Sequence, residues 1–388
     1  MTGVRNLVVY MADGVRWDHH PDAVAEMGTT FRGIAASTHT PSSIASMLTG
    51  LHLPTHGVRG FTDPLPADVE TMLEWFSTAG LSESPGNFND VIYGTLLGRY
   101  DRVSLADATP PFGWFMRDAG GHAPYDGFDG RLQTDESVRS YLRDHAGDEA
   151  RMRRDYAAAV ESSVERFERF VLQPLRERDL LAETLVVFLS DHGQLLGEYG
   201  HVGESYPACP EVVYVPVTFV HPDLPRGEKR PELFRHVDVP ATVAGLLAGV
   251  DASDTQGRDL FADGDHPDYG ATFYDRPYPS FLGEFSYTID SLWERDGGHV
   301  FVRSGAWTKC KLAAGFLSRI PAGTQLRRSR SALGLKMLFE NRRTWGDPTR
   351  TASDAEAILD ALKRPDVPDP DLTLSEDAVR NLRELGYL

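Results

Sequence analysis

The chain has 388 residues, 41% of them hydrophobic and 25% charged, the composition of a globular protein with room for a large domain and a smaller one. Its formal net charge of −18 argues against nucleic acid or an anionic membrane as a partner, because both would repel a broadly acidic surface. Only two cysteines, Cys209 and Cys310, are present, so there is no disulfide framework, although a single bridge between them stays open. No signal-peptide pattern and no membrane-spanning run is recognisable, and we therefore expect a cytoplasmic protein.

Two short apolar runs end in groups that can bind a metal. Residues 6–11 predict a buried strand followed by Asp13, and residues 185–189 predict a second one followed by Asp191 and His192. In open α/β sheets, ligands bind beyond the carboxyl ends of the strands, where these side chains would meet. Carboxylate oxygen and imidazole nitrogen suit a divalent cation. The two runs together predict a metal site built across a mostly parallel sheet.

A helix is expected over residues 41–49, because Pro41 fits the first helical position and Gly50 fits the stop. Thr40 would then be the N-cap, with its hydroxyl at the positive end of the helix dipole. Ordinary capping accounts for a threonine at this place. A hydroxyl that also serves catalysis is the alternative.

Three segments together resemble the sulfatase family of the alkaline phosphatase superfamily. They are Asp13-Gly14, the stretch PSSIASMLTGLHLPTHGV from Pro41 to Val58, and the stretch SDHGQLLGEYGH from Ser190 to His201. The closing residues 382–388 are also similar to the ends of many members. The resemblance implies an α/β fold, with a large, mostly parallel sheet sandwiched by helices and a smaller C-terminal α+β subdomain.

The resemblance also implies metal-dependent hydrolysis of sulfate or phosphate esters. One divalent metal (Ca, Mn or Zn) per chain would be held by Asp13, Thr40, Asp191 and His192. The substrate would be a small-molecule or glycan ester. The oligomeric state stays open.

The chain departs from the family pattern at the nucleophile. The Cys/Ser-x-Pro-Ser-Arg motif is absent, and the second Asp of the usual pair is Gly14. Aligning on Leu48-Thr49-Gly50 places the nucleophile at Thr40, whereas aligning on Pro41 places it at His39. We favour Thr40, which resembles the phosphodiesterases and phospho-group transferases of the superfamily. Sulfate-ester hydrolysis, phosphoester chemistry and an inert metal-binding descendant all stay open.

Two further histidines are candidate catalytic residues. His122 lies in a His-x-Pro-Tyr sequence after a predicted strand over residues 112–115, and it is similar to the histidine that sulfatase-like enzymes bring to the substrate. Asp118 and His122 could instead hold a second metal, but no third ligand is evident. His201 is predicted to protonate the leaving group.

Three residues are predicted to contact the substrate: His39, Arg16 and Lys309. Lys309 would lie on a hairpin from Arg303 to Lys309 that resembles one in the family's C-terminal sheet, with Lys311 as an alternative. A solvated lysine on a strand face is the simpler interpretation of either.

The sequence divides near residue 260, where Asp, Gly and Pro accumulate. Residues 1–260 are expected to form the sulfatase-like catalytic domain and residues 261–388 the C-terminal subdomain. In the first part, helices are expected over 65–80 and 155–180 and from Asp238, with a strand over 212–220. In the second part, strands are expected over 281–289, 300–304 and 307–312, then a linker over 366–371 and a terminal helix.

Overall fold

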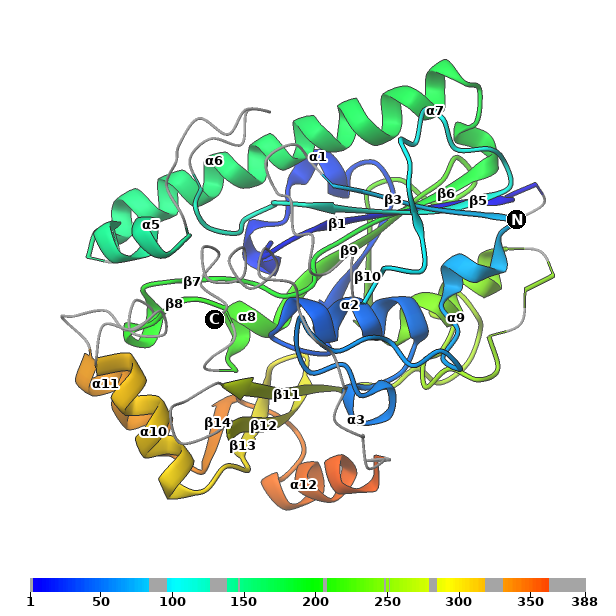
Figure 1. The fold of residues 1–388 in the computed structure, drawn as a ribbon. Coiled ribbons are helices and arrows are strands. Elements are labelled where there is room, and N and C mark those ends of the chain that lie inside the picture. The colour runs from blue at the N-terminus through cyan, green and yellow to red at the C-terminus, as the bar shows by residue number, and fades with distance from the viewer. Residues whose placement is uncertain are drawn as a thin grey trace.

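The structure is a computed structural model that describes residues 3–83, 96–125, 138–145, 147–204, 208–247, 249–250, 252–278, 285–317 and 331–362. Its centre is an eight-stranded sheet between two layers of helices (Figure 1). In the order of the sheet, the strands are β10 (Glu228–Arg235), β2 (Thr29–Ile34), β9 (Tyr214–Val220), β6 (Thr184–Leu189), β1 (Asn6–Ala12), β5 (Phe112–Asp118), β3 (Thr78–Glu83) and β4 (Asp101–Arg102). β9 runs antiparallel to both neighbours and the other pairs are parallel. The predicted α/β fold with a mostly parallel sheet is confirmed.

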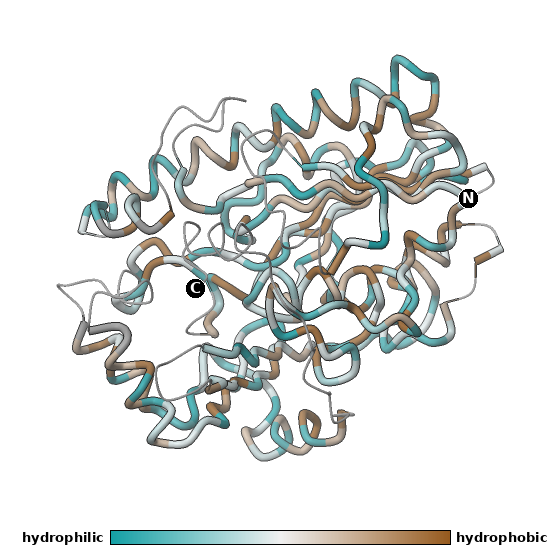
Figure 2. Tube along the Cα trace, in the orientation of Figure 1, coloured by the Kyte–Doolittle hydropathy of each residue, from teal (hydrophilic) through white to brown (hydrophobic). Residues whose placement is uncertain are grey.

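The central strand β1 is apolar on both faces because both faces are covered by helices. Leu7, Val9 and Met11 belong to the hydrophobic core shared with helices α2 (Thr40–Thr49) and α9 (Asp238–Leu246). Val8 and Tyr10 belong to the core shared with helix α6 (Glu149–Phe167). Successive strand residues point to opposite faces, so an unbroken apolar run fills both layers. Hydrophobic residues accordingly follow the central strands (Figure 2).

The helices are distributed over the two faces of the sheet and the C-terminal part (Figure 1). Their bounds are α1 (Asp22–Ala25), α2 (Thr40–Thr49), α3 (Leu53–His56), α5 (Val138–His145), α6 (Glu149–Phe167), α7 (Gln173–Glu177), α8 (Pro210–Val213), α9 (Asp238–Leu246), α10 (Ala306–Leu317), α11 (Ser331–Phe339) and α12 (Ala352–Ala361). α6 continues through a π-helical turn, Glu168–Leu172, into α7, which confirms the long helix predicted over 155–180. Among the described residues, no helix is long and apolar enough to span a bilayer.

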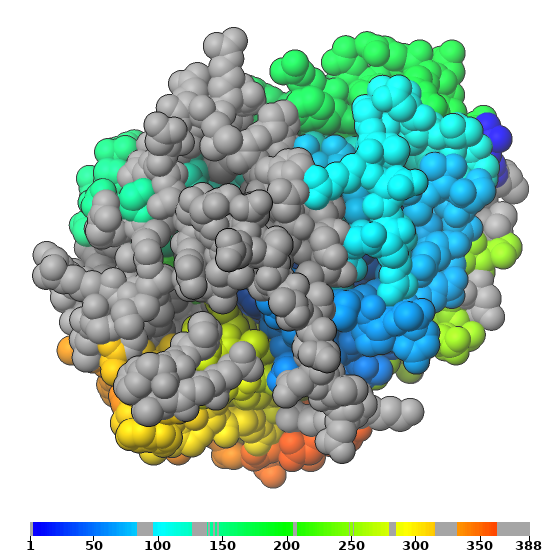
Figure 3. All heavy atoms as spheres, viewed as in Figure 1, coloured from blue at the N-terminus to red at the C-terminus, as the bar shows by residue number. Residues whose placement is uncertain are grey.

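A second, antiparallel sheet lies in the C-terminal part. Its strands, in sheet order, are β11 (Gly270–Tyr278), β12 (Phe285–Glu294), β13 (Gly297–Val302) and β14 (Arg342–Gly346). It is not an isolated unit, because Tyr274 and Trp293 share a hydrophobic core with Ile34 and Tyr214 of the large sheet. The described residues of this part, coloured yellow to red, form the lower edge of the molecule in the space-filling view (Figure 3). The division near residue 260 falls in the connection between α9 and β11 and stays a prediction.

Two predicted elements are wrong. The helix over 65–80 is replaced by a short 3-10 turn, Met72–Trp75, which a Thr71–Glu74 capping box begins, and then by β3. The strand over 307–312 is part of helix α10. The predicted strand over 212–220 is shortened, because α8 precedes β9. The linker over 366–371 and the terminal helix lie outside the described residues.

Candidate active site

Asp13, Asp191 and His192 meet at the carboxyl ends of β1 and β6. One ligand atom from each lies within 4.8 Å of the other two, and all three side chains are buried. His192 Nε2 is 3.3 Å from Asp191 Oδ2 and 3.9 Å from Asp13 Oδ1. Among the described residues, this is the one set of three or more acidic, histidine or cysteine side chains with metal-binding spacing. The sequence therefore predicts which three side chains come together.

Each of the three side chains is fixed at one atom. Asp13 Oδ2 accepts a 2.6 Å hydrogen bond from Arg117, Asp191 Oδ1 accepts one of 3.1 Å from the Gly14 amide, and His192 Nδ1 lies 2.9 Å from the Gly193 carbonyl. The carbonyl contact places the proton on Nδ1 and leaves the lone pair on Nε2.

One oxygen of each carboxylate has no hydrogen bond and lies near His192 Nε2. Asp13 Oδ1 and Asp191 Oδ2 are buried and have no hydrogen-bond partner among the described residues. Unsatisfied carboxylate oxygens are costly in a protein interior, and a divalent cation would satisfy both. Two oxygens and one imidazole nitrogen, each anchored from behind, fit such a metal.

The electrostatics of the cluster also favour a cation. Burial raises the pKa of Asp191, and the neighbouring Asp13 carboxylate raises it further. Burial acts to lower the pKa of His192, but Asp191 and Asp13 outweigh it and raise that pKa. Burial acts to raise the pKa of Asp13, but His122, Arg117 and His192 hold it below its usual value. The two carboxylates repel each other, and bound positive charge would relieve that repulsion.

Thr40 is the first residue of α2 and not its N-cap, so this detail of the prediction is wrong. His39 is the N-cap and makes no side-chain capping bond. The Thr40 hydroxyl lies 3.1 Å from His192 Nε2. The Thr40 hydroxyl therefore lies beside the three candidate ligands, within hydrogen-bond distance of His192.

Gly14, which stands where the family pattern has a second Asp, has a backbone reason to be glycine. Its φ of +70° is in the left-handed region, and a Cβ there would lie 3.3 Å from the backbone of Gly121 and His122. A side chain at this position would strain the turn and press on the loop opposite. The close approach brings His122 beside the cluster.

Arg117 is a site residue that the sequence analysis missed. It projects from β5 and is almost fully buried, with Nη2 2.6 Å from Asp13 Oδ2 and Nη1 3.6 Å from Glu83 Oε1. The signal in the sequence is a charged residue inside an otherwise apolar strand. Such a residue is rarely buried unless it is paired.

The structure argues against a second metal at Asp118 and His122. Arg166 contacts both oxygens of Asp118, at 2.5 and 3.0 Å, and the Gly120 amide donates to Asp118 Oδ2. Both oxygens are thus occupied. His122 Nδ1 lies 2.7 Å from the Ala123 carbonyl, and its charge influences Asp13. His122 therefore stays a candidate for contact with the substrate.

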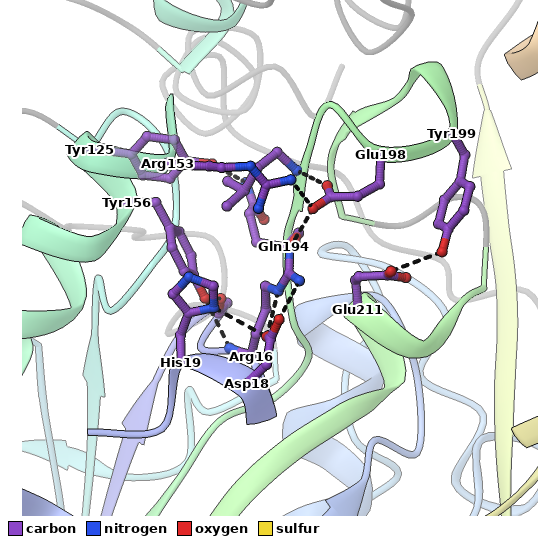
Figure 4. Close-up of polar contacts among 12 residues, drawn as sticks. Arg16, Asp18, His19, Tyr125, Arg153, Tyr156, Gln194, Glu198, Tyr199 and Glu211 are labelled. Carbon is purple, nitrogen blue, oxygen red and sulfur yellow. Dashed lines mark hydrogen bonds and ion pairs between the residues drawn. The ribbon is translucent and has the colours of Figure 1, made fainter. Parts of the chain in front are cut away.

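Arg16 belongs to an ion-pair network and not to the cluster (Figure 4). Its guanidinium donates to both oxygens of Asp18, at 2.8 and 2.6 Å, and to Glu198 Oε1 at 2.9 Å. Glu198 also accepts a hydrogen bond of 2.7 Å from Arg153. This network uses the donors of Arg16 to hold the segment after β1 against the segment after His192, and a contact of Arg16 with the substrate stays a prediction.

Lys309 also has structural contacts that the sequence could not identify. It lies on α10 and is 2% exposed, and Nζ donates to the carbonyls of Phe339 and Glu340 and, at 2.6 Å, to Asn341 Oδ1. These carbonyls end α11, where a cation is favourable. Lys309 is therefore a structural cap between two helices.

Burial lowers the pKa of both remaining candidate histidines, His39 and His201. His39 precedes Thr40, and its Nδ1 lies 3.1 Å from the Arg59 carbonyl. Burial, together with the charge of Arg276, lowers the pKa of His39 well below its usual value. His201 is buried against the Gly334 backbone of α11, and burial lowers its pKa to about 4. The contribution of His201 to leaving-group protonation stays a prediction.

The fold and this cluster define a class: enzymes of the alkaline phosphatase superfamily, which cleave or transfer sulfate and phosphate groups. A family model described as Sulfatase matches residues 95–250. The low-salt glycan biosynthesis sulfotransferase Agl7 of Haloferax volcanii is 30% identical over 416 residues, covering 100% of this chain and 97% of that protein. The chain belongs to the sulfatase family.

Solved structures agree on the fold at much lower sequence identity. A 2-O GAG sulfatase superposes with a TM-score of 0.59 at 14% identity, covering 77% of this chain and 83% of its own. The phosphonate monoester hydrolase of Agrobacterium radiobacter also gives 0.59 at 14% identity, covering 86% and 94%. At this identity the likeness shows the fold alone.

Proposed function

We propose that the protein is a metal-dependent enzyme that moves the sulfuryl group of a sulfate ester by way of the Thr40 hydroxyl. The observation that carries the proposal is the 3.1 Å approach of that hydroxyl to His192 Nε2, beside two carboxylate oxygens that lack hydrogen bonds. A threonine that only capped α2 would direct its oxygen at backbone amides of the first turn. Thr40 directs it into the cluster instead.

The reaction divides into two transfers at sulfur. In the first, Thr40 Oγ1 gives its proton to solvent and forms a bond to sulfur while the bond from sulfur to the leaving oxygen breaks. The leaving alcohol takes up a proton, which we assign to His122, oriented by the Ala123 carbonyl. In the second, an acceptor hydroxyl gives its proton to His122 and bonds to sulfur, while the bond from sulfur to Thr40 Oγ1 breaks and Thr40 takes up a proton from solvent.

Asp13, Asp191 and His192 would hold the divalent metal, with Thr40 completing the set. Such a cation supplies positive charge that lowers the pKa of a nearby hydroxyl and neutralises the outer oxygens of a sulfate group. Arg117 keeps Asp13 in place from behind. Because the chain as a whole has a net charge of −18, the positive charge of such a metal would attract an anionic ester to the site.

We infer that the acceptor is a sugar hydroxyl and that the substrate is a glycan or a small sulfate ester. The support is the full-length relative, which is a glycan biosynthesis sulfotransferase at 30% identity, and a structural neighbour named as a GAG sulfatase. Hydrolysis uses the same first transfer with water as the acceptor. Phosphate esters are the second candidate, because a threonine nucleophile resembles that of superfamily phosphodiesterases.

The test is to supply an aryl sulfate with Mn²⁺ or Ca²⁺, with and without a sugar acceptor, and to measure both aryl alcohol and inorganic sulfate. Transfer predicts more aryl alcohol than inorganic sulfate and a sugar that gains one sulfuryl group by mass. Hydrolysis predicts equal amounts of the two products. Parallel aryl phosphate mono- and diesters test the second candidate.

The Thr40 variants decide whether that hydroxyl is the nucleophile. Thr40→Ala should lose nearly all turnover, Thr40→Ser should keep part of it, and His39→Ala should alter mainly KM. All three should remain folded, because His39 makes no side-chain capping bond to α2 and the Thr40 hydroxyl contacts His192. Turnover by Thr40→Ala at the wild-type rate would refute the proposal, as would a complete absence of ester cleavage by the metal-loaded wild type.

A further inference from the structure

The pair of helices α10 and α11 presents apolar side chains outward. On α10 the exposed residues Trp307, Cys310 and Ala314 follow helical spacing and form one stripe, whereas Lys309 and Leu312 point inward. Trp307 is 69% exposed. This arrangement reverses the ordinary one, in which an outward helix face carries the charged residues.

α11 repeats the pattern. Its exposed residues Leu333, Lys336 and Phe339 recur every three residues, and Leu333 and Phe339 are 40% and 44% exposed. The large hydrophobic side chains found exposed among the described residues are Trp307, Leu333 and Phe339, all on this helix pair. Large apolar side chains gathered at one exposed place mark an interaction surface.

The charge of this region is opposite to that of the chain. The described residues of the two helices contain three lysines and no Asp or Glu, in a chain with a net charge of −18, and of the three lysines Lys309 is buried whereas Lys336 is exposed. Lys311 lies beside the apolar stripe, with Nζ 6.0 Å from the centre of the Trp307 ring. The net charge of the whole chain therefore does not describe the surface that this helix pair presents.

We propose that the outward face of α10 and α11 docks the protein on an anionic membrane surface. Exposed Trp, Leu and Phe beside basic residues are the combination with which interfacial helices bind such a surface, the rings entering the headgroup region and the cations meeting acidic lipids. The chemistry fits an anionic bilayer better than an acidic protein, because the protruding residues are mostly apolar.

The helix pair also contacts the segment that follows the metal ligands Asp191 and His192 in the sequence. α11 contacts the 3-10 turn Glu198–Gly200, and the next residue, His201, meets the Gly334 backbone. The pair lies on the side of the molecule at which the central strands end (Figure 1). Docking would therefore bring the site close to the lipid surface. The inference does not depend on the chemistry assigned to Thr40.

The experiment is flotation of the full chain with vesicles of phosphatidylglycerol or of phosphatidylcholine. We expect binding to phosphatidylglycerol that weakens as salt is raised, and little binding to phosphatidylcholine. Lys336→Gln should weaken binding about fivefold, since one cation near an anionic surface contributes about that factor. Trp307→Ser, an exposed substitution that leaves the fold intact, should weaken it further.

Lys229→Gln is the matched control, because Lys229 is an exposed lysine on β10, outside the helix pair. It should bind as the wild type does, and none of the three variants should change turnover of a soluble substrate. Equal binding to both lipids, or undiminished binding by both Trp307→Ser and Lys336→Gln, would overturn the proposal. So would retention by heparin without vesicle binding, or a dimer in solution that Trp307→Ser disrupts.

Discussion

At the scale of single residues, two buried arginines, Arg117 on β5 and Arg166 on α6, pair with carboxylates at the ends of neighbouring strands. Arg117 pairs with Asp13, whose other oxygen belongs to the metal cluster, whereas Arg166 occupies both oxygens of Asp118. Both pairs are buried, so both carboxylates depend on their arginine for compensation. A cation at the cluster could compensate the charge of Asp13 in place of Arg117, but it could not compensate Asp118 in place of Arg166.

Arg117→Met should therefore destabilise the metal-free protein by about 3–5 kcal/mol, the usual effect of leaving a buried charge unpaired. Added Mn²⁺ should recover much of that loss, because it binds the folded form and compensates Asp13. The measurement is urea unfolding with chelator and with Mn²⁺.

Arg166→Met is the control for this experiment. Relative to the wild type under the same condition, this variant should lose a similar free energy of unfolding with chelator and with Mn²⁺. Equal recovery of the two variants would show that the metal does not sit at Asp13.

The sequence could identify Asp13, Asp191 and His192 because each follows an apolar strand, and topology alone brings such ends together. It could not identify Arg117, whose contact with Asp13 depends on the register in which Met11 lies opposite Arg117 between β1 and β5. The sequence also could not identify the structural contacts of Arg16 and Lys309, for a related reason. Their long side chains can reach many partners, and the sequence does not say which partner lies within reach.

At the scale of elements, the misread segment over 307–312 shows how local pattern can mislead. Within it, the four residues KCKL from Lys309 to Leu312 alternate polar and apolar residues as a strand does. The chain forms a helix there because Lys309 and Leu312 face α11 and β12, and because Lys309 caps a helix that comes later in the sequence. The segment over 65–80 shows the opposite case, in which the apolar spacing predicts a helix. There the Thr71 capping box and the pairing of β3 with β5 override the helical pattern.

Lys309→Met should reduce the free energy of unfolding by about 1.5–3 kcal/mol, since it removes charge-assisted hydrogen bonds to the end of α11. The kcat and KM of the remaining folded enzyme should not change, because Lys309 does not contact the cluster. The measurements are urea unfolding and steady-state kinetics side by side.

Lys311→Met provides the comparison, since Lys311 is partly exposed and lies over the Phe285 ring at 5.2 Å. It should change stability by no more than about 0.5 kcal/mol. A large rise in KM for Lys309→Met with unchanged stability would instead restore its assignment to the substrate site.

At the scale of the whole molecule, stability should depend on pH through histidines buried between α2, α3 and the C-terminal sheet. Burial lowers the pKa of His52 to about 3, helped by Arg235, and lowers that of His56 to about 3, helped by His52. The Val58 amide donates to His56 Nδ1, and Nε2 lies 3.1 Å from Ser46 Oγ, an arrangement that suits the neutral ring.

In the unfolded chain these histidines titrate near pH 6.5, so below that pH the unfolded state binds more protons than the folded state. Their contribution to stability is therefore complete above about pH 6.5 and is lost progressively toward pH 3. Each should contribute a slope of about 1.4 kcal/mol per pH unit over this window.

His56→Gln tests the assignment by comparison of unfolding free energies at pH 7.5 and pH 5, with chelator present throughout. The variant should be less stable than the wild type at pH 7.5, and the gap should narrow by about 1.4 kcal/mol for each pH unit of acidification below 6.5. A gap that is the same at both pH values would mean that His56 is not held neutral.

The outward stripe of α10 has a chemical consequence, because it contains a thiol. Both cysteines are unbridged; Cys310 is exposed in that stripe, whereas Cys209 is buried and burial raises the pKa of its thiol well above the usual value. A maleimide dye should therefore label the native protein at one position, three residues from Trp307. The emission of the dye would report whether this face is exposed to solvent or covered by a partner. No cysteine needs to be introduced for this measurement.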